Sequence, residues 1–158
     1  MSIHTGLESK DRQAVAKILH KILADEYILL VKTKNFHWNV VGPDFTELHK
    51  LFDEQYAQIA VFADDVAERA RSLGEYAIGT MEEFLKFANL RESPGKYPQA
   101  AAMIEALLND HETVIRELRK DLQACADKHQ DMGTSDFLTG LMEEHEKIAW
   151  MLRAYQQK

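Results

Sequence analysis

The sequence predicts an all-α protein in which four long helices pack as a bundle, with a short helix in the connection between the second and third. Apolar residues recur at helical spacing through four long segments of the 158-residue chain. The chain has only 7 glycines and 3 prolines, too few for a β-fold rich in turns. No segment has the period-two alternation of a strand, so we expect no sheet.

The first helix is predicted from about Ser9 to Asn39. Ser9 is a candidate N-cap, because its side chain can accept a hydrogen bond from a free backbone N–H of the first turn. Gly42 and Pro43 break the helix. Its apolar face comprises Val15, Ile18, Leu19, Ile22, Leu23, Tyr27, Leu30 and Val31.

The second helix is predicted to begin at Asp44, where Glu47 three residues later completes a capping box. It runs to about Leu73, and Gly74 has the conformational freedom expected just after a helix. Its apolar face comprises Leu48, Leu51, Phe52, Ile59, Phe62 and Val66.

A second capping box, Thr80 with Glu83, opens a short helix that ends near Phe87. The third long helix starts near Pro98 and ends between Asp127 and Asp131, and the fourth starts at Thr134 or Ser135. The connection from the second to the third long helix exceeds twenty residues. A crossover of that length lets these two helices run in the same direction within a four-helix bundle.

Four metal-capable side chains share one face of the second predicted helix. At about 100° per residue, His49, Asp53, Asp64 and Glu68 fall at about 0°, 40°, 60° and 100° around the axis. A fifth candidate, His37, lies at the end of the preceding helix. Each residue alone is an ordinary helix-face or core residue, but the joint pattern favours a metal site.

These side chains cannot meet at one metal within a single chain. The eleven residues from Asp53 to Asp64 span about 16 Å, far beyond a coordination sphere. Yet His49 with Glu68, and Asp53 with Asp64, centre on the same point of the helix, between Gln58 and Ile59. Two antiparallel copies of the helix would therefore build two identical metal sites between subunits of an isologous dimer.

The residues around these positions resemble a known family. Residues 34–40, Lys-Asn-Phe-His-Trp-Asn-Val, and residues 42–53, from Gly42 to Asp53, resemble the signature of the Dps family of mini-ferritins. Residues 64–69, Asp-Asp-Val-Ala-Glu-Arg, are similar to that family's second ligand segment. The match is strongest over the first two helices, and the rest agrees in architecture, including the short helix in the crossover.

The resemblance implies a ferritin-like fold and an activity. It implies that His37, His49 and Asp53 of one subunit, with Asp64 and Glu68 of its twofold mate, are ferroxidase ligands. It also implies a dodecameric shell that oxidises Fe(II) with hydrogen peroxide or dioxygen and stores an Fe(III) mineral. The expected metal is therefore iron (Fe2+/Fe3+), and the expected role is protection against oxidative stress. Trp38 is a candidate electron donor or an interface packing residue.

Other polar residues support weaker hypotheses. The family places acidic pores near the turn between the third and fourth long helices. Two interpretations are therefore open for the acidic residues there, iron entry and helix capping; the residues are Asp127, Asp131 and Asp136. The remaining histidines show no carboxylate partner set in the sequence; they are His4, His20, His111, His129 and His145.

Composition limits the class of protein. The charge of −7 disfavours a nucleic-acid backbone as partner and leaves cations as plausible ones. A single cysteine, Cys125, precludes an intrachain disulfide, which fits a reducing, cytoplasmic location. We see no membrane span and no signal peptide. We expect one domain over residues 1–158, with residues 1–8 as a flexible tail.

Three alternatives remain to be weighed. A di-iron site inside one bundle uses Glu-x-x-His on two helices, and no glutamate here has a histidine three residues later. A DNA-compacting protein is the main alternative, but the residues before Ser9 carry no Lys or Arg, the C-terminus offers only Lys158, and twelve copies at −7 total −84. A purely structural bundle leaves the symmetric ligand set unexplained.

Overall fold

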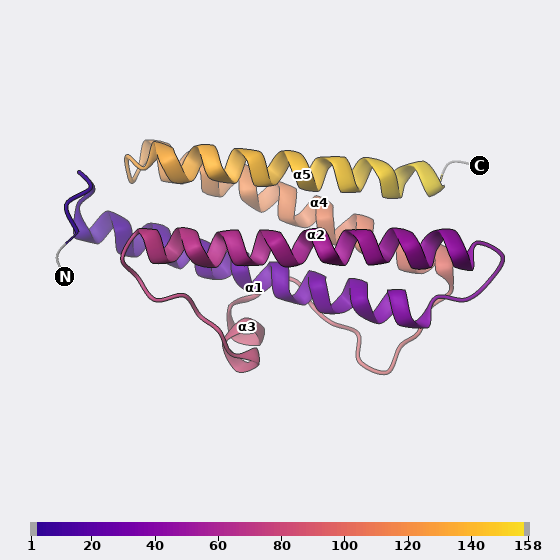
Figure 1. The fold of residues 1–158 in the computed structure, drawn as a ribbon. Helices are drawn as coiled ribbons and strands as arrows, with labels where there is room; N and C mark the ends of the chain where they lie inside the picture. Colours follow the sequence, from indigo (N-terminus) through magenta and orange to yellow (C-terminus); the bar gives the residue numbers. More distant parts are fainter. Residues whose placement is uncertain (1–2, 157–158) are drawn as a thin grey trace.

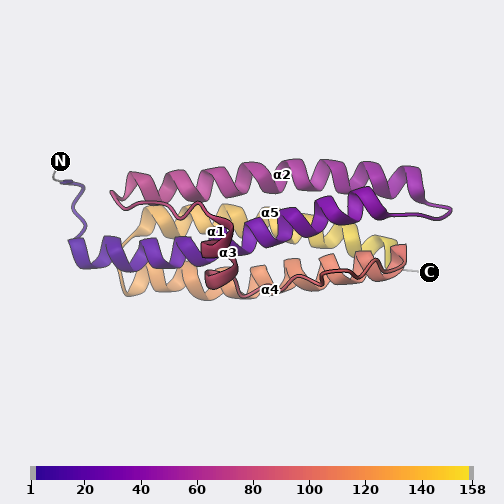
Figure 2. The ribbon, with the colours of Figure 1, turned by 90° about the horizontal axis from the view of Figure 1, so that it is seen from below.

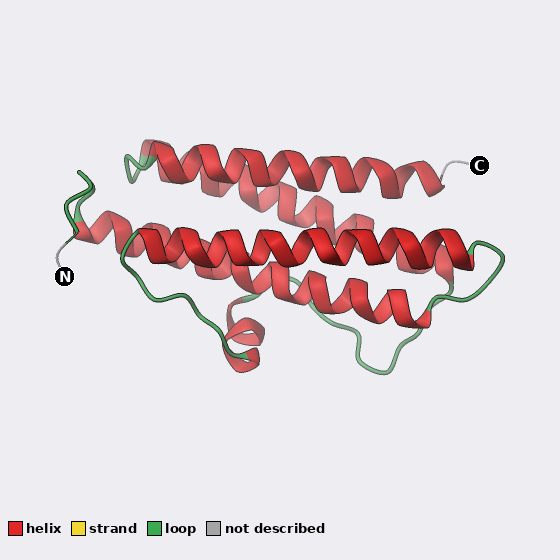
Figure 3. Ribbon diagram, in the orientation of Figure 1, coloured by secondary structure: helices red, strands yellow, loops and turns green. Residues whose placement is uncertain are grey.

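The computed structural model describes residues 3–156, and all of the secondary structure in that range is helical (Figures 1 and 3). In chain order the helices are α1 (Ser9–Asn39), α2 (Phe45–Ser72), α3 (Met81–Phe87), α4 (Ala100–Asp127) and α5 (Met132–Gln156). The predicted four long helices and one short crossover helix are confirmed. No described helix is both long and apolar enough to cross a membrane.

The long helices form two antiparallel pairs, α1 with α2 and α4 with α5 (Figure 1). The crossover carries the chain back along the length of the bundle, so α2 and α4 run in the same direction, as predicted (Figures 1 and 2). Ion pairs join α1 to α4: Lys21 lies 2.7 Å from Asp121, and Lys32 lies 2.5 Å from Asp110. The core between the pairs is filled mainly by leucine, isoleucine, valine and phenylalanine.

The short helix α3 packs against α1 rather than joining the bundle. The rings of Tyr27 and Phe84 stack with their centroids 4.0 Å apart. Two residues earlier on α1, the buried carboxylate of Asp25 accepts hydrogen bonds from the backbone N–H groups of Asn89 and Leu90, at 2.7 and 2.9 Å. Burial raises the pKa of Asp25. These contacts fix the crossover across the outer face of α1.

The helix ends test the predicted capping signals. The capping box of Thr80 and Glu83 is present at α3. Gly74 has φ +88°, and the N–H of the next residue reaches back to the carbonyl of Ala70, which is a Schellman motif. The box predicted at Asp44 is wrong, because this residue occupies the cap position without a side-chain hydrogen bond.

Two other predicted starts also differ. Ser9 is the first helical residue of α1, and Glu8 holds the cap position without a side-chain bond. Pro98 lies two residues before the first residue of α4. The first eight residues fall partly outside the described range, as does Lys158. Within that range, Ile3 lies against Gly74 and the carbonyl of Leu7 accepts a hydrogen bond from Arg12.

The turn between α4 and α5 shows which interpretation applies to Asp131. Its Oδ1 accepts the backbone N–H of Thr134 at 2.9 Å, and its Oδ2 accepts the hydroxyl of Thr134 at 2.6 Å. Arg69 of α2 lies 3.1 Å from Oδ1, and Asp131 is buried. Asp131 therefore caps α5, which is why this helix starts at Met132, ahead of the predicted Thr134 or Ser135. Asp127 and Asp136 are exposed.

Candidate metal centre at the α1–α2 turn

Two histidines face each other where α1 passes into α2. His37 lies in the last turn of α1 and is buried, and His49 lies in the second turn of α2 and is partly exposed. Their imidazole rings stack with centroids 3.8 Å apart. The short connection between the helices brings the two histidines together. Phe45 stacks on the other face of the His49 ring, with the ring centroids 5.1 Å apart.

Reciprocal hydrogen bonds fix the protonation pattern of both rings. His37 Nδ1 lies 2.7 Å from the backbone carbonyl oxygen of His49, and His49 Nδ1 lies 2.8 Å from the carbonyl oxygen of His37. Because a carbonyl oxygen only accepts, each Nδ1 must carry the hydrogen. In the neutral rings, both Nε2 atoms then keep their lone pairs. A hydrogen bond from the other ring nitrogen to a carbonyl is the usual way in which a metal-binding histidine is oriented.

Asp53 brings a carboxylate to this pair. Its Oδ1 lies 3.9 Å from His37 Nε2, and about half of its side chain is exposed. Tyr56, one turn further along α2, donates its hydroxyl hydrogen to the same oxygen. That hydrogen bond raises the pKa of Tyr56. His37 therefore lies between His49, which it stacks on, and the carboxylate of Asp53.

Asp64 and Glu68 lie elsewhere on α2. Both are exposed, and the helical rise places Asp64 about 16 Å from Asp53 along the axis. In the part of the chain that the structure describes, no group of three or more His, Cys, Asp or Glu side chains is placed to hold a metal ion. The structure thus brings three of the five predicted ligands together and separates them from the other two.

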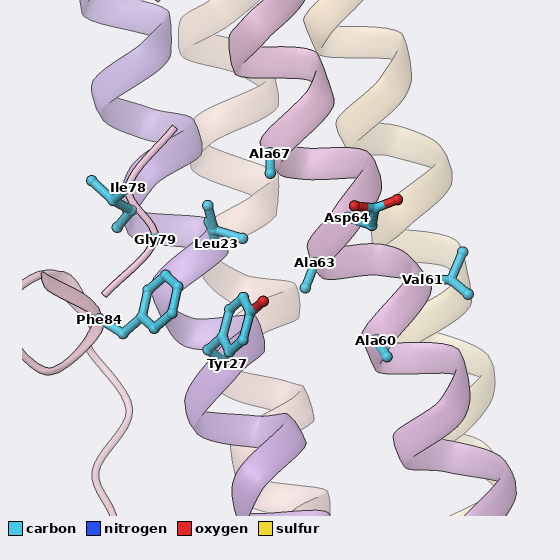
Figure 4. A pocket seen from close by; sticks show the side chains of 10 residues that line it. All are labelled: Leu23, Tyr27, Ala60, Val61, Ala63, Asp64, Ala67, Ile78, Gly79 and Phe84. Atoms are coloured by element: carbon cyan, nitrogen blue, oxygen red, sulfur yellow. The ribbon is translucent and has the colours of Figure 1, made fainter. Parts of the chain in front are cut away.

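A shallow groove of about 440 Å³ runs along the face of α2 that carries Asp64 (Figure 4). Small α2 side chains form one wall: Ala60, Ala63 and Ala67. Tyr27 of α1 and Phe84 of α3 form the other wall. The exposed Val61 extends the apolar surface. A helix surface of small residues lets another helix approach closely.

Trp38 faces a different part of the surface. It is 67% exposed, and it lines a cleft of about 500 Å³ with Phe36, Pro94 and Pro98. Its ring lies 6.0 Å from the ammonium group of Lys34. One residue step around a helix is about 100°, so adjacency to His37 in sequence does not place the Trp38 ring on the histidine pair.

A second histidine pair lies in the bundle core, and the sequence did not reveal it. His111 Nδ1 lies 2.9 Å from His145 Nδ1, and His145 Nε2 lies 2.8 Å from Glu26 Oε1. All three side chains are fully buried. Burial, and the charge of His145, hold the pKa of His111 well below its ordinary value. We call these three residues the core triad.

Two of the histidines for which the sequence showed no carboxylate partner set each have one carboxylate neighbour in the structure. His145 contacts Glu26, and His129 lies 3.0 Å from Asp11. The partners are 119 and 118 residues apart in sequence, so no local spacing signals them. An indirect signal existed, because Glu26 and His145 both lie on the apolar faces of their helices, among residues that the bundle must bury.

Comparisons with known proteins agree with this architecture. The family model for the ferritin-like domain matches residues 16–158. An uncharacterised low temperature-induced protein of Nostoc is 52% identical over 153 residues, covering 97% of this chain and 86% of that protein. DNA protection during starvation protein 2 of Bacillus anthracis is 39% identical over 142 residues, covering 89% and 95%.

A solved structure is similar over nearly the whole chain. It is the Dps protein of Vibrio cholerae, described as a member of a broad superfamily of ferritin-like diiron-carboxylate proteins, and it superposes with a TM-score of 0.91 at 28% identity. The alignment covers 99% of this chain and 98% of that one. The fold, the family model and these relatives agree, and the chain belongs to the Dps family of ferritin-like proteins.

Proposed function

We propose that this protein is a ferroxidase that oxidises Fe(II) at sites shared between two subunits and stores the Fe(III) product inside a dodecameric shell. The observation that carries the proposal is the reciprocal pairing of His37 and His49, which leaves the Nε2 lone pairs of both neutral rings open, with the Asp53 carboxylate 3.9 Å from Nε2 of His37. Imidazole nitrogen suits Fe(II), and carboxylate oxygen stabilises the harder Fe(III) that forms.

The site needs a second chain to be complete. Three ligands from one subunit underfill the coordination sphere of iron, and Asp64 and Glu68 of the same chain are out of reach. The apolar groove beside Asp64 supports a twofold partner, because an antiparallel α2 of a second copy, packed on the small residues, would bring its own Asp64 and Glu68 opposite His49 and Asp53. We propose that these five residues, His37, His49, Asp53, Asp64 and Glu68, are the iron ligands.

The reaction uses iron as substrate and hydrogen peroxide or dioxygen as the electron acceptor. The chain's residues hold Fe(II) and leave positions open for the oxidant, because five side chains, some binding through a single atom, do not saturate iron. Trp38 is a lesser proposal as an electron donor, since its ring faces the cleft beside residues 92–98 rather than the histidines. Protection against oxidative stress would follow from removing Fe(II) and peroxide together.

Subunit mixing tests the shared site. His49→Ala and Glu68→Ala are each expected to lose most of the rapid Fe(II) oxidation. When the two variants are co-assembled at random, half of the twofold dimers are mixed, and each of these has one intact site. About a quarter of the sites should then recover. If exchange of subunits is confirmed and no activity returns, the shared site is wrong.

A matched pair of substitutions gives the control. Asp65 is adjacent to Asp64, and both are exposed on α2. Asp64→Asn is expected to slow Fe(II) oxidation, whereas Asp65→Asn is expected to leave it unchanged. Light scattering of the wild-type protein tests the shell, since twelve chains of 18.2 kDa give about 218 kDa. A stable monomer or a 24-subunit particle would contradict the dodecamer.

We propose that DNA binding is weak or absent at neutral pH and moderate salt. Each chain carries −7, so an assembled shell should repel a phosphate backbone unless cations bridge the two. A gel-shift titration with plasmid DNA, with and without Mg²⁺, checks this. Tight retention without magnesium would overturn it.

A further inference from the structure

Tyr56 contacts two of the proposed iron ligands and has no role in the site as described so far. Its hydroxyl donates to Asp53 Oδ1. Its ring stands edge-on to the His37 ring, with the centroids 5.3 Å apart and the planes at 75°. The ammonium group of Lys34 lies over the phenol ring, 4.9 Å from its centroid.

Helix geometry explains why the phenol meets the carboxylate. Residues three apart lie on the same face of α2, and long side chains on a helix lean toward its N-terminus. The Tyr56 side chain therefore leans back over Asp53. Within the described residues, the contacts of the Asp53 carboxylate are with Tyr56 and His37, and neither is a permanently charged group.

A carboxylate that is half exposed on a helix is free to turn about its side-chain bonds. The phenol hydroxyl removes part of that freedom, because it occupies one lone pair of Oδ1. Both contacts of the carboxylate within the described residues are on Oδ1, so both lone pairs of Oδ2 remain for a metal ion. The edge-on packing against His37 couples the same phenol to the ring whose Nε2 lies 3.9 Å from Oδ1.

We propose that Tyr56 is a positioning residue that holds Asp53 by Oδ1, so that the carboxylate binds iron through a single oxygen, Oδ2. The inference rests on the proposed function, because it assumes that Asp53 is an iron ligand. Partners that orient metal ligands in this way typically change metal affinity or activity 10–100-fold when they are removed. Loss of the hydroxyl should also let both carboxylate oxygens reach the metal, which changes its coordination number.

The experiment titrates the assembled protein with Co(II) in place of Fe(II). Co(II) is stable toward oxygen at such sites, and its visible absorption reports the coordination number. Tyr56→Phe keeps the ring against His37 and removes the hydroxyl. Tyr97→Phe, at an exposed tyrosine in the loop before α4, makes the same chemical change away from the site. Asp53→Asn removes the carboxylate charge.

We expect Tyr56→Phe to raise the Co(II) dissociation constant about tenfold and to alter the visible band, with Tyr97→Phe matching the wild type. If Asp53→Asn binds Co(II) as the wild type does, the proposed metal site itself fails. If Asp53→Asn weakens binding while Tyr56→Phe matches the wild type in affinity and spectrum, only the positioning role is overturned. A Tyr56→Phe chain that no longer assembles, judged by size-exclusion chromatography, also overturns it in favour of a structural role.

Discussion

This chain contains two histidine pairs, His37 with His49 and His111 with His145, and they use their ring nitrogens in opposite ways. At the α1–α2 turn, His37 and His49 each point Nδ1 at a backbone carbonyl, so that Nε2 of each neutral ring keeps its lone pair, and Nε2 of His37 lies 3.9 Å from Asp53. In the core triad, His111 and His145 point Nδ1 at each other, and His145 Nε2 is taken by Glu26. The residue types are nearly the same, but the partners differ.

The difference shows that surroundings decide what a histidine does. Backbone carbonyls at a helix junction accept a hydrogen bond and leave the second nitrogen for a ligand near solvent. In an apolar core, a nitrogen without a partner costs free energy, so the side chains pair with one another. The first arrangement leaves two ring nitrogens open to a ligand. The second arrangement links three helices, α1, α4 and α5, by two buried polar contacts.

The largest effect is expected from breaking the core triad. Glu26→Leu leaves His145 buried without its acceptor, and removing one partner of a buried pair typically costs about 3–5 kcal/mol of unfolding free energy. Glu105→Leu, at an exposed position on α4, should change stability by less than about 0.5 kcal/mol. Chemical denaturation of the assembled variants measures both. Replacing all three triad residues with leucine should recover most of the loss, and failure to recover it would contradict this account.

The next effect separates the two pairs by activity. His49→Gln removes a proposed ligand nitrogen and should slow Fe(II) oxidation about 100-fold, at the upper end of the effects of substitutions around metal sites. His145→Gln makes the same change in the core triad and should leave the oxidation rate per assembled shell within about twofold. Stopped-flow absorbance of both variants checks this. Equal losses in the two variants would mean that the pairs do not differ in function.

The stability of the folded chain should depend on pH through the core triad, because the pKa of His111 is shifted. The pKa of His111 is lowered in the folded chain, so below about pH 6.5 the unfolded chain binds a proton that the folded chain resists. Stability therefore falls as the pH drops below this value, by up to about 1.4 kcal/mol per pH unit for one group. Denaturation midpoints between pH 7 and pH 5 should fall less steeply in His111→Leu than in the wild type. An unchanged slope would exclude His111 as the cause.

The smallest effect concerns the outer pair. Phe45 is 45% exposed and lies on the outer face of His49, with the ring centroids 5.1 Å apart. An aromatic contact of this kind contributes about 0.5–1.5 kcal/mol. Phe45→Leu should therefore raise the Co(II) dissociation constant of the assembled protein only a few-fold. If Phe45→Leu weakens Co(II) binding as much as His49→Gln does in the same titration, Phe45, and not the reciprocal hydrogen bonds, orients the His49 ring.

The sequence was sufficient for the features that depend on short-range chemistry. Helical periodicity predicted every long helix, the Thr80–Glu83 box and Gly74 marked two helix ends, and the stripe from His49 to Glu68 lies on one helix as expected. The capping predictions at Ser9 and Asp44 were wrong because a capping residue type only permits the bond. Whether the capping hydrogen bond forms depends on the backbone conformation with which the residues before the helix lead into its first turn.

Only the tertiary structure decided the contacts between distant residues. Spacing along one helix is set by its fixed rise and turn, so the sequence by itself shows that Asp53 and Asp64 share a face and cannot share a metal within one chain. The meeting of His145 with Glu26, of Asp131 with Arg69, and of the two rings at the α1–α2 turn depends on how four helices pack. Burial favours these pairings, because an unpaired polar group in an apolar core costs free energy.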